Sequence, residues 1–155
     1  MALKEHFTAD EWNLLRNAVF WVFYFIAEVD GQVDSGEVDA LFSVFQGGLG
    51  LSNELAREVV ADISLDPEGA IKAFESVNRS APMGLKDVAD LLAIKTGPEI
   101  ARAFSQTMVF LGTMFARASD IVLGDTKGSR ISQQEQMAII VVAAILRLDV
   151  EDLLI

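Results

Sequence analysis

Signals for the start of a helix recur along this 155-residue chain, and they constrain its fold more than any other feature. Three are capping boxes, in which an Asp, Ser or Thr side chain and a Glu three residues later each accept a hydrogen bond from a backbone N–H that the helix leaves unpaired. The three boxes are Thr8 with Glu11, Asp34 with Glu37, and Ser132 with Glu135. Pro67 and Pro98 also suit the first position of a helix, where the missing N–H of proline is harmless.

These signals predict an all-α fold. No stretch alternates between apolar and polar residues over a length that would indicate a strand. We expect one compact helical domain over residues 1–155, with about seven to eight helices. Ser52 is the expected cap of the third helix, Pro82 opens the fifth, and Asp149 caps a short final turn. The expected helices cover residues 9–29, 35–46, 53–64, 67–78, 82–95, 98–119 and 133–147.

A degenerate repeat predicts two pseudo-symmetric helical hairpins. The apolar run Ala18–Ala27 leads to the capping box at Asp34, and the apolar stretch Thr107–Ala116 leads through a longer loop to the box at Ser132. The alternative, that the two hairpins arose independently and are not a repeat, stays open. Because the helices over 9–29, 98–119 and 133–147 carry the long apolar runs, we expect them to form the buried centre.

Composition and charge exclude several classes of function. The chain has no cysteine, which excludes disulfides and thiol nucleophiles, and its single histidine leaves little material for a catalytic triad. The net charge of −11 argues against a nucleic-acid partner. The longest uncharged apolar runs have ten residues, too few to cross a membrane, and the N-terminus does not resemble a signal peptide. We therefore expect a cytoplasmic, non-enzymatic protein without membrane insertion.

The turn between the first two expected helices is strongly acidic. Five acidic residues lie in this turn or in the helix ends beside it, namely Glu28, Asp30, Asp34, Glu37 and Asp39, and residues 26–55 contain no lysine or arginine. The second half of this turn matches a calcium-binding EF-hand loop, but the first ligand position falls on an isoleucine. Carboxylate oxygens favour calcium or magnesium over zinc or copper. One hypothesis is a weak metal site formed by Glu28, Asp30, Asp34 and Glu37; the alternative is that these residues only cap helices and form the turn.

The same residues resemble a known family. The segment from Phe25 to Leu41, FIAEVDGQVDSGEVDAL, resembles the signature hairpin of TerB-like proteins of bacterial tellurite resistance. The segment Ile131–Glu135, with Ala143–Leu148 farther on, is similar to the second hairpin of that family. The resemblance implies a compact helical domain with internal pseudo-symmetry, a cytoplasmic role in tellurite or general stress resistance, and an acidic patch that binds divalent metal. Arg130 in the second copy departs from the acidic pattern of the first.

Two functions from different classes follow. The first is a TerB-like stress-response domain whose acidic hairpin binds a divalent cation or a basic protein partner. The second is a helical interaction module, or a domain that binds a small apolar ligand, without a metal site. Met108, Met114 and Met137 lie in apolar helix stretches, and we expect them to fill the core. The alternative is that methionine and phenylalanine side chains together line a small apolar pocket. Self-association into a homo-oligomer stays open.

Overall fold

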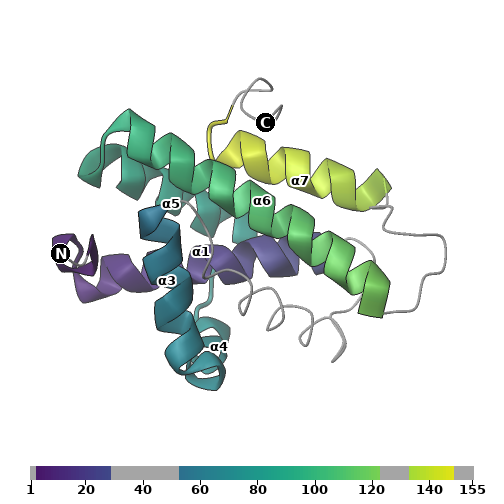
Figure 1. Cartoon of the computed structure of the whole chain (residues 1–155), viewed down its shortest axis with the longest axis horizontal. Helices are drawn as coiled ribbons and strands as arrows, with labels where there is room; N and C mark the ends of the chain where they lie inside the picture. The colour runs from purple at the N-terminus through teal and green to yellow at the C-terminus, as the bar shows by residue number, and fades with distance from the viewer. Residues whose placement is uncertain (1–2, 29–52, 123–132, 149–155) are drawn as a thin grey trace.

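The computed structural model describes residues 3–28, 53–122 and 133–148 (Figure 1). Within these ranges the chain is helical and has no strand, so the expected all-α class is confirmed. The described part holds one short 3₁₀ helix and six α-helices, which does not establish the expected total of seven to eight. The elements are η1 (Leu3–His6), α1 (Ala9–Glu28), α3 (Glu54–Leu65), α4 (Pro67–Glu75), α5 (Ala81–Lys95), α6 (Pro98–Val122) and α7 (Gln133–Ile145). None of these helices is long and apolar enough to cross a membrane.

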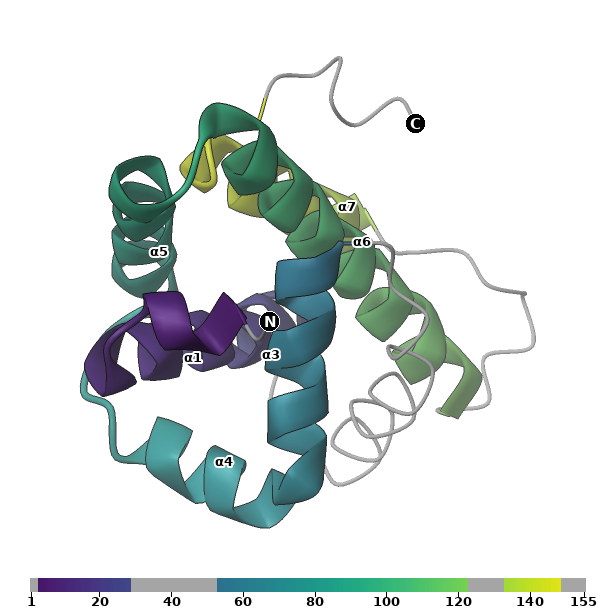
Figure 2. The same ribbon diagram turned by 60° about the vertical axis from the view of Figure 1, so that its left-hand side comes forward.

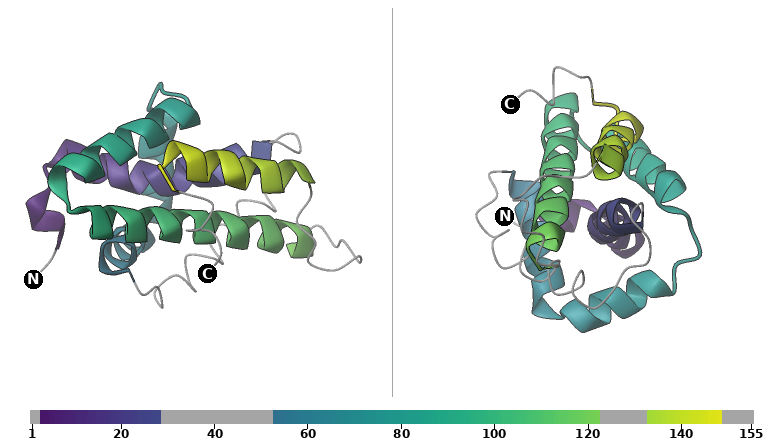
Figure 3. Two further views of the ribbon diagram at one scale, coloured as in Figure 1. Left: turned by 90° about the horizontal axis from the view of Figure 1, so that it is seen from above. Right: turned by 90° about the vertical axis from the view of Figure 1, so that its right-hand side faces the viewer.

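Helix α1 is the centre of the described fold. Every residue from 18 to 23 is buried, so no side of the helix at this level faces solvent. A helix that is apolar on all sides needs neighbours on all sides. Helices α3, α4, α5, α6 and α7 all contact α1. Figure 2 and the end-on view on the right of Figure 3 show them arranged around it.

The start of α1 follows the predicted capping box. The Thr8 backbone N–H donates to Glu11 Oε1 at 2.8 Å, and the Glu11 N–H donates to Thr8 Oγ1 at 3.1 Å. The Thr8 N–H, with Lys95 close by, holds the pKa of Glu11 below its ordinary value. Because the folded chain lowers this pKa, the box stabilises the fold at neutral pH and loses that contribution as the carboxylate becomes protonated in acid.

The other helix starts agree with the sequence to within one residue. Pro67 and Pro98 occupy the first positions of α4 and α6, as expected. Helix α5 begins at Ala81, which places Pro82 second. The expected cap of α3 at Ser52 is wrong, because Asn53 is the N-cap and its side chain accepts a hydrogen bond from the Ala56 N–H at 2.8 Å. Serine and asparagine cap about equally well, so their order in the sequence could not decide between them.

Helix α7 does not belong to the buried centre in the way its sequence suggested. Ala138, Val142 and Leu146 are buried, but Met137 and Ile140 are 61% and 53% exposed. The described helices α1, α5 and α6 pack against α7, and they leave one side of it uncovered. The apolar sequence of α7 therefore predicted more burial than these neighbours provide.

The described residues include only part of the predicted pair of hairpins. Helices α6 and α7 pack against each other and run in opposite directions (Figures 1 and 3). The turns that define the repeat, with residues 29–52 and 123–132, lie outside the described residues. The pseudo-symmetry of the two hairpins therefore stays a prediction.

Helix α5 approaches α1 closely at Gly84. A Cβ atom added at Gly84 would lie 2.4 Å from Cε2 of Trp21 and 2.5 Å from its Cζ2. These atoms belong to a buried indole that also makes an edge contact with Phe74, with ring centroids 6.0 Å apart. Glycine is therefore required at position 84 because any side chain would meet a ring that is already held in place.

Candidate functional site

The predicted metal site lies almost entirely outside the described residues. Glu28 is the last residue of α1, and Asp30, Asp34 and Glu37 fall within residues 29–52. The structure therefore does not show whether these four carboxylates converge. Among the residues that are described, no group of three or more His, Asp or Glu side chains could hold a metal ion.

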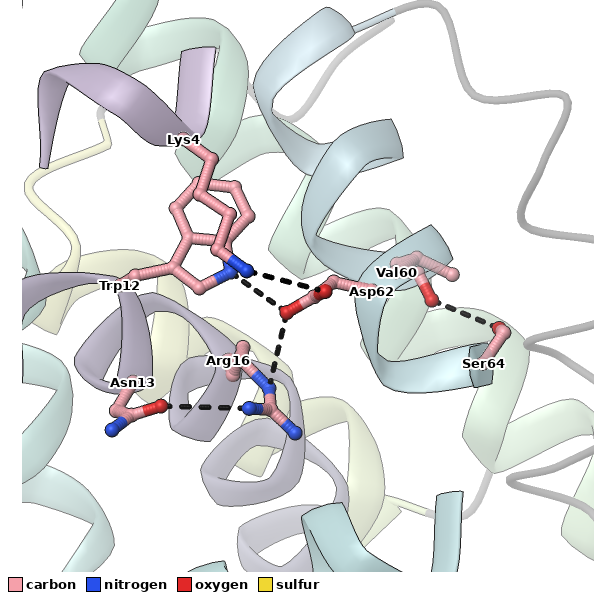
Figure 4. Close-up of polar contacts among 7 residues, drawn as sticks. All are labelled: Lys4, Trp12, Asn13, Arg16, Val60, Asp62 and Ser64. Atoms are coloured by element: carbon pink, nitrogen blue, oxygen red, sulfur yellow. Dashed lines mark hydrogen bonds and ion pairs between the residues drawn. The ribbon is translucent and has the colours of Figure 1, made fainter. Parts of the chain in front are cut away.

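A charged cluster centred on Asp62 joins three elements, η1, α1 and α3 (Figure 4). The Trp12 Nε1–H donates to Asp62 Oδ2 at 2.9 Å. Lys4 Nζ lies 3.5 Å from Asp62 Oδ1, and Arg16 Nε lies 3.7 Å from Oδ2. The Lys4 ammonium also sits 5.8 Å from the centroid of the Trp12 ring. Two cations and one indole N–H thus share a single partly buried carboxylate.

The Asp62 cluster is suited to stabilise the fold rather than to bind a ligand. Its carboxylate is already neutralised, and its Trp12 partner is a buried core residue that packs against Phe7 with ring centroids 6.0 Å apart. A tryptophan N–H taken out of water needs an acceptor, because an unpaired buried donor destabilises the folded state. Asp62 supplies that acceptor from α3 and so fixes α3 against the start of α1.

We expect Asp62→Ala to lower the free energy of unfolding by about 1–2 kcal/mol, because the Trp12 N–H and two cations lose their partner. Asp62→Asn keeps an acceptor oxygen for Trp12 and removes only the charge, so it should cost less than half as much. Urea unfolding followed by tryptophan fluorescence measures both values. Equal stability of wild type and Asp62→Ala would contradict the assigned role.

A cavity lies between α5, α6 and the end of α7. Its volume is about 380 Å³, within the range of small-molecule sites. The floor is buried and consists of Ala89, Leu92, Ser105 and Leu146. The rim is exposed and consists of Ala93, Pro98, Arg102 and Arg147, with Ala101 and Leu148 half-buried between floor and rim. We call this feature the α5–α6–α7 cavity; in the left view of Figure 3, α7 ends beside the diverging helices α5 and α6.

Ser105 is the polar residue in the floor of the α5–α6–α7 cavity. It is 3% exposed, and its hydroxyl makes no hydrogen bond within the described part of the chain. Other described helical hydroxyls donate to the carbonyl four residues earlier, namely those of Ser64, Thr96, Thr107 and Thr113. The Ser105 hydroxyl is not among the fully buried atoms without a partner in the described residues, so it is accessible from the cavity to a water molecule or a ligand. The Ser105 hydroxyl therefore gives the cavity a hydrogen-bonding group that the fold itself does not use.

Arg147 reaches the rim through an uncommon backbone conformation. The Leu148 N–H donates to the Ala143 carbonyl at 2.9 Å and the Arg147 N–H to the Ala144 carbonyl at 3.0 Å, which is the Schellman pattern for the end of a helix. The left-handed residue of this motif is usually glycine, but here it is Arg147, with φ of 65°. A side chain in this conformation costs roughly 1 kcal/mol. The guanidinium of Arg147 forms an ion pair with Asp90 of α5, which holds it beside the cavity.

Sequence reasoning missed the cavity residues. Met108 is buried in the core, as expected, whereas Met137 is exposed. The alternative, a pocket lined by methionines and phenylalanines, is not this cavity, because neither residue type lines it. Two features of the sequence point to the observed site in retrospect. Ser105 interrupts the buried face of its helix, and Arg147 stands between Leu146 and Leu148 where a helix ends.

Comparison with models of protein families, with curated proteins and with solved structures gives no match.

Proposed function

We propose that this chain is a non-enzymatic helical domain that binds a small, largely apolar molecule in the α5–α6–α7 cavity. The observation that carries the proposal is the cavity itself, whose floor is apolar apart from the hydroxyl of Ser105, a residue that is 3% exposed. Ligand sites commonly combine apolar walls with a small number of polar groups that orient the ligand. Because the cavity has a buried floor and an exposed rim, a ligand can enter it from solvent.

The lining of the cavity favours binding over catalysis. The described lining residues include no His, Asp, Glu or Lys, so no side chain there can act as a general base for the Ser105 hydroxyl. His6, the single histidine of the chain, lies in η1 and is not among the residues that line the cavity. A serine without a base is a hydrogen-bonding group and not an activated nucleophile.

We expect 1-octanol, a neutral apolar probe, to bind saturably and to shift the NMR signals of amides around the cavity. Ala93→Phe places a large side chain at the exposed rim, where it should block entry and abolish these shifts without unfolding the protein. Ile94→Phe is the matched control, because Ile94 is 81% exposed and is not a lining residue. Non-saturating shifts, or equal binding by both variants, would exclude the cavity as the site.

We also propose, from the sequence, a TerB-like cytoplasmic role in stress or tellurite resistance, with the acidic hairpin as a site for calcium, magnesium or a basic partner protein. The supporting observation is the group of five acidic residues from Glu28 to Asp39, in a region, residues 26–55, that contains no lysine or arginine. A field of one sign attracts cations and basic surfaces.

We expect calcium or magnesium to raise the melting temperature at concentrations on the order of 10⁻⁴–10⁻³ M, the range of weak calcium modules. Asp34→Asn should abolish this shift while leaving stability in chelator nearly unchanged, since asparagine caps a helix about as well as aspartate. Thermal denaturation with and without chelator measures both effects. No shift in the wild-type protein at millimolar cation would remove the metal hypothesis and leave helix capping as the role of Asp34.

A further inference from the structure

We infer that the ligand of the α5–α6–α7 cavity is an uncharged molecule that ends in one hydrogen-bonding oxygen, a hydroxyl or a carbonyl, which binds the Ser105 hydroxyl while the hydrocarbon part lies toward the rim. This inference rests on the proposed binding function and adds to it the chemical class of the ligand and its orientation.

The cavity has a deep end and an open end. Helices α5 and α6 are joined through Gly97, and Ala89 and Ser105 lie equally far from Gly97 along the chain. Both of these residues are buried and line the cavity. Ala93 and Pro98, beside the turn, line it as well but are exposed. The deep end is therefore at Ala89 and Ser105, and a ligand enters from the side of the turn.

The deep end offers one polar side chain, that of Ser105. Two other hydroxyls on α6 are used within the helix itself. Thr107 Oγ1 donates to the Ala103 carbonyl at 2.8 Å. Thr113 Oγ1 donates to the Val109 carbonyl at 3.1 Å. The Ser105 hydroxyl is instead accessible from the cavity, and because a hydroxyl can both donate and accept, it suits an alcohol or a carbonyl compound.

The charges at the rim already have partners within the chain. Arg147 forms an ion pair with Asp90, and Arg102 also interacts with another group of the chain. The described lining contains no Asp, Glu, His or Lys. An ion that entered the cavity would lose its hydration without meeting an unpaired charge of opposite sign among these residues, which is unfavourable. The ligand that fits this lining is therefore uncharged.

The orientation of the ligand follows from where the polar group of the floor lies. Leu92 and Leu146 make up the rest of the floor together with Ala89, and they favour contact with hydrocarbon. A ligand with its oxygen at the rim would place hydrocarbon against the Ser105 hydroxyl. With its oxygen at the deep end, the hydrogen bond to Ser105 replaces the one that the ligand loses to water.

The test compares phenol with toluene, which share a ring and differ in a hydroxyl against a methyl group, by NMR titration of the intact chain. We expect both to bind saturably. Ser105→Ala should weaken phenol binding about threefold to tenfold, since it removes one hydrogen bond, and should change toluene binding by less than about twofold. The variant should fold, because alanine only removes the oxygen and favours a helix.

Thr107→Val is the matched control, because it removes a hydroxyl from the same helix at a position that does not line the cavity. It should leave the affinities for phenol and toluene unchanged. The amide signals that differ most between the phenol and toluene complexes should be those of Ala89, Ser105 and their neighbours. Differences confined to the rim would overturn the orientation.

The remaining outcomes separate this inference from the proposed function. An unchanged affinity for phenol in Ser105→Ala, equal weakening of phenol and toluene, or saturable binding of toluene alone would overturn the inference while the binding function stands. Benzoate, which is ionised at pH 7, should bind at least about tenfold more weakly than phenol; binding as tight as that of phenol would overturn the uncharged class. If neither phenol nor toluene binds saturably, the proposed binding function fails instead.

Discussion

Replacing Val22 with Asp will leave the chain unfolded at 25 °C without denaturant. Val22 is 0% exposed and lies in the fully buried stretch of α1 around which the other described helices pack. No basic side chain is among the buried residues of the core, so the new carboxylate would have no partner there. Burying an unpaired polar group costs several kcal/mol, and an ionised one costs more. That cost is comparable with the whole stability of a domain, about 5–15 kcal/mol.

Circular dichroism and one-dimensional NMR will show the loss of helical signal and of dispersed methyl resonances. The matched control is Asn13→Asp, which adds the same charge to the same helix at an exposed position. Asn13 accepts a hydrogen bond from Arg16, and an aspartate can accept it as well. We expect Asn13→Asp to melt like the wild-type protein. A cooperative, near wild-type transition in Val22→Asp would show that α1 is not the centre of the fold.

Replacing Gly84 with Ala will destabilise the protein by about 3 kcal/mol, at the upper end of the cost of overpacking a core. The added methyl group would lie 2.4 Å from the Trp21 ring, and the contact of that ring with Phe74 limits its movement. Alanine has a higher helix propensity than glycine by about 1 kcal/mol, so the clash must exceed this gain for the variant to be less stable. Equilibrium unfolding in urea measures the difference.

A double-mutant cycle with Trp21→Phe separates the clash from other effects. The smaller ring removes the fused-ring atoms that the new methyl group would meet, so Gly84→Ala should cost much less in the Trp21→Phe background. If the cost is the same in both backgrounds, the close approach of α5 to α1 is not its cause. If Gly84→Ala raises stability in the wild-type background, helix propensity outweighs packing at this position.

The sequence predicted the helices well because caps are local. The Thr8–Glu11 box and the prolines at 67 and 98 act within one turn of chain, and the structure places α1, α4 and α6 at those starts. The ends were less certain, since α6 continues to Val122 where the sequence suggested 119 and α4 ends at Glu75 where it suggested 78. Helix ends fray, and they are the part of a helix that sequence patterns predict least well.

The sequence could not decide which apolar helix lies at the centre. Residues 18–27 and 137–146 have equally long apolar runs, yet only α1 is enclosed, and α7 exposes Met137 and Ile140. Hydrophobic burial has no direction, so an apolar run shows that a helix can be buried but not how many neighbours will cover it. The acidic turn is the opposite case. The sequence shows which acidic residues it contains and how they are spaced. Metal binding there stays a prediction, because a metal site requires the carboxylates to lie close together in the folded chain.

The candidate site shows most clearly which features the sequence determines and which depend on the tertiary structure. The sequence by itself determined the all-α class, the starts of most described helices and the group of acidic residues from Glu28 to Asp39. Only the tertiary structure brought Ser105 and Arg102 of α6 together with Arg147 beyond α7 and the apolar residues of α5. Leu146, Arg147 and Leu148 lie far along the chain from the lining residues of α5 and α6, and none of these residues carries a motif on its own. The packing of α5, α6 and α7 around α1 brings these residues together. Local propensity determines where each helix forms, but only mutual burial determines how the helices are placed.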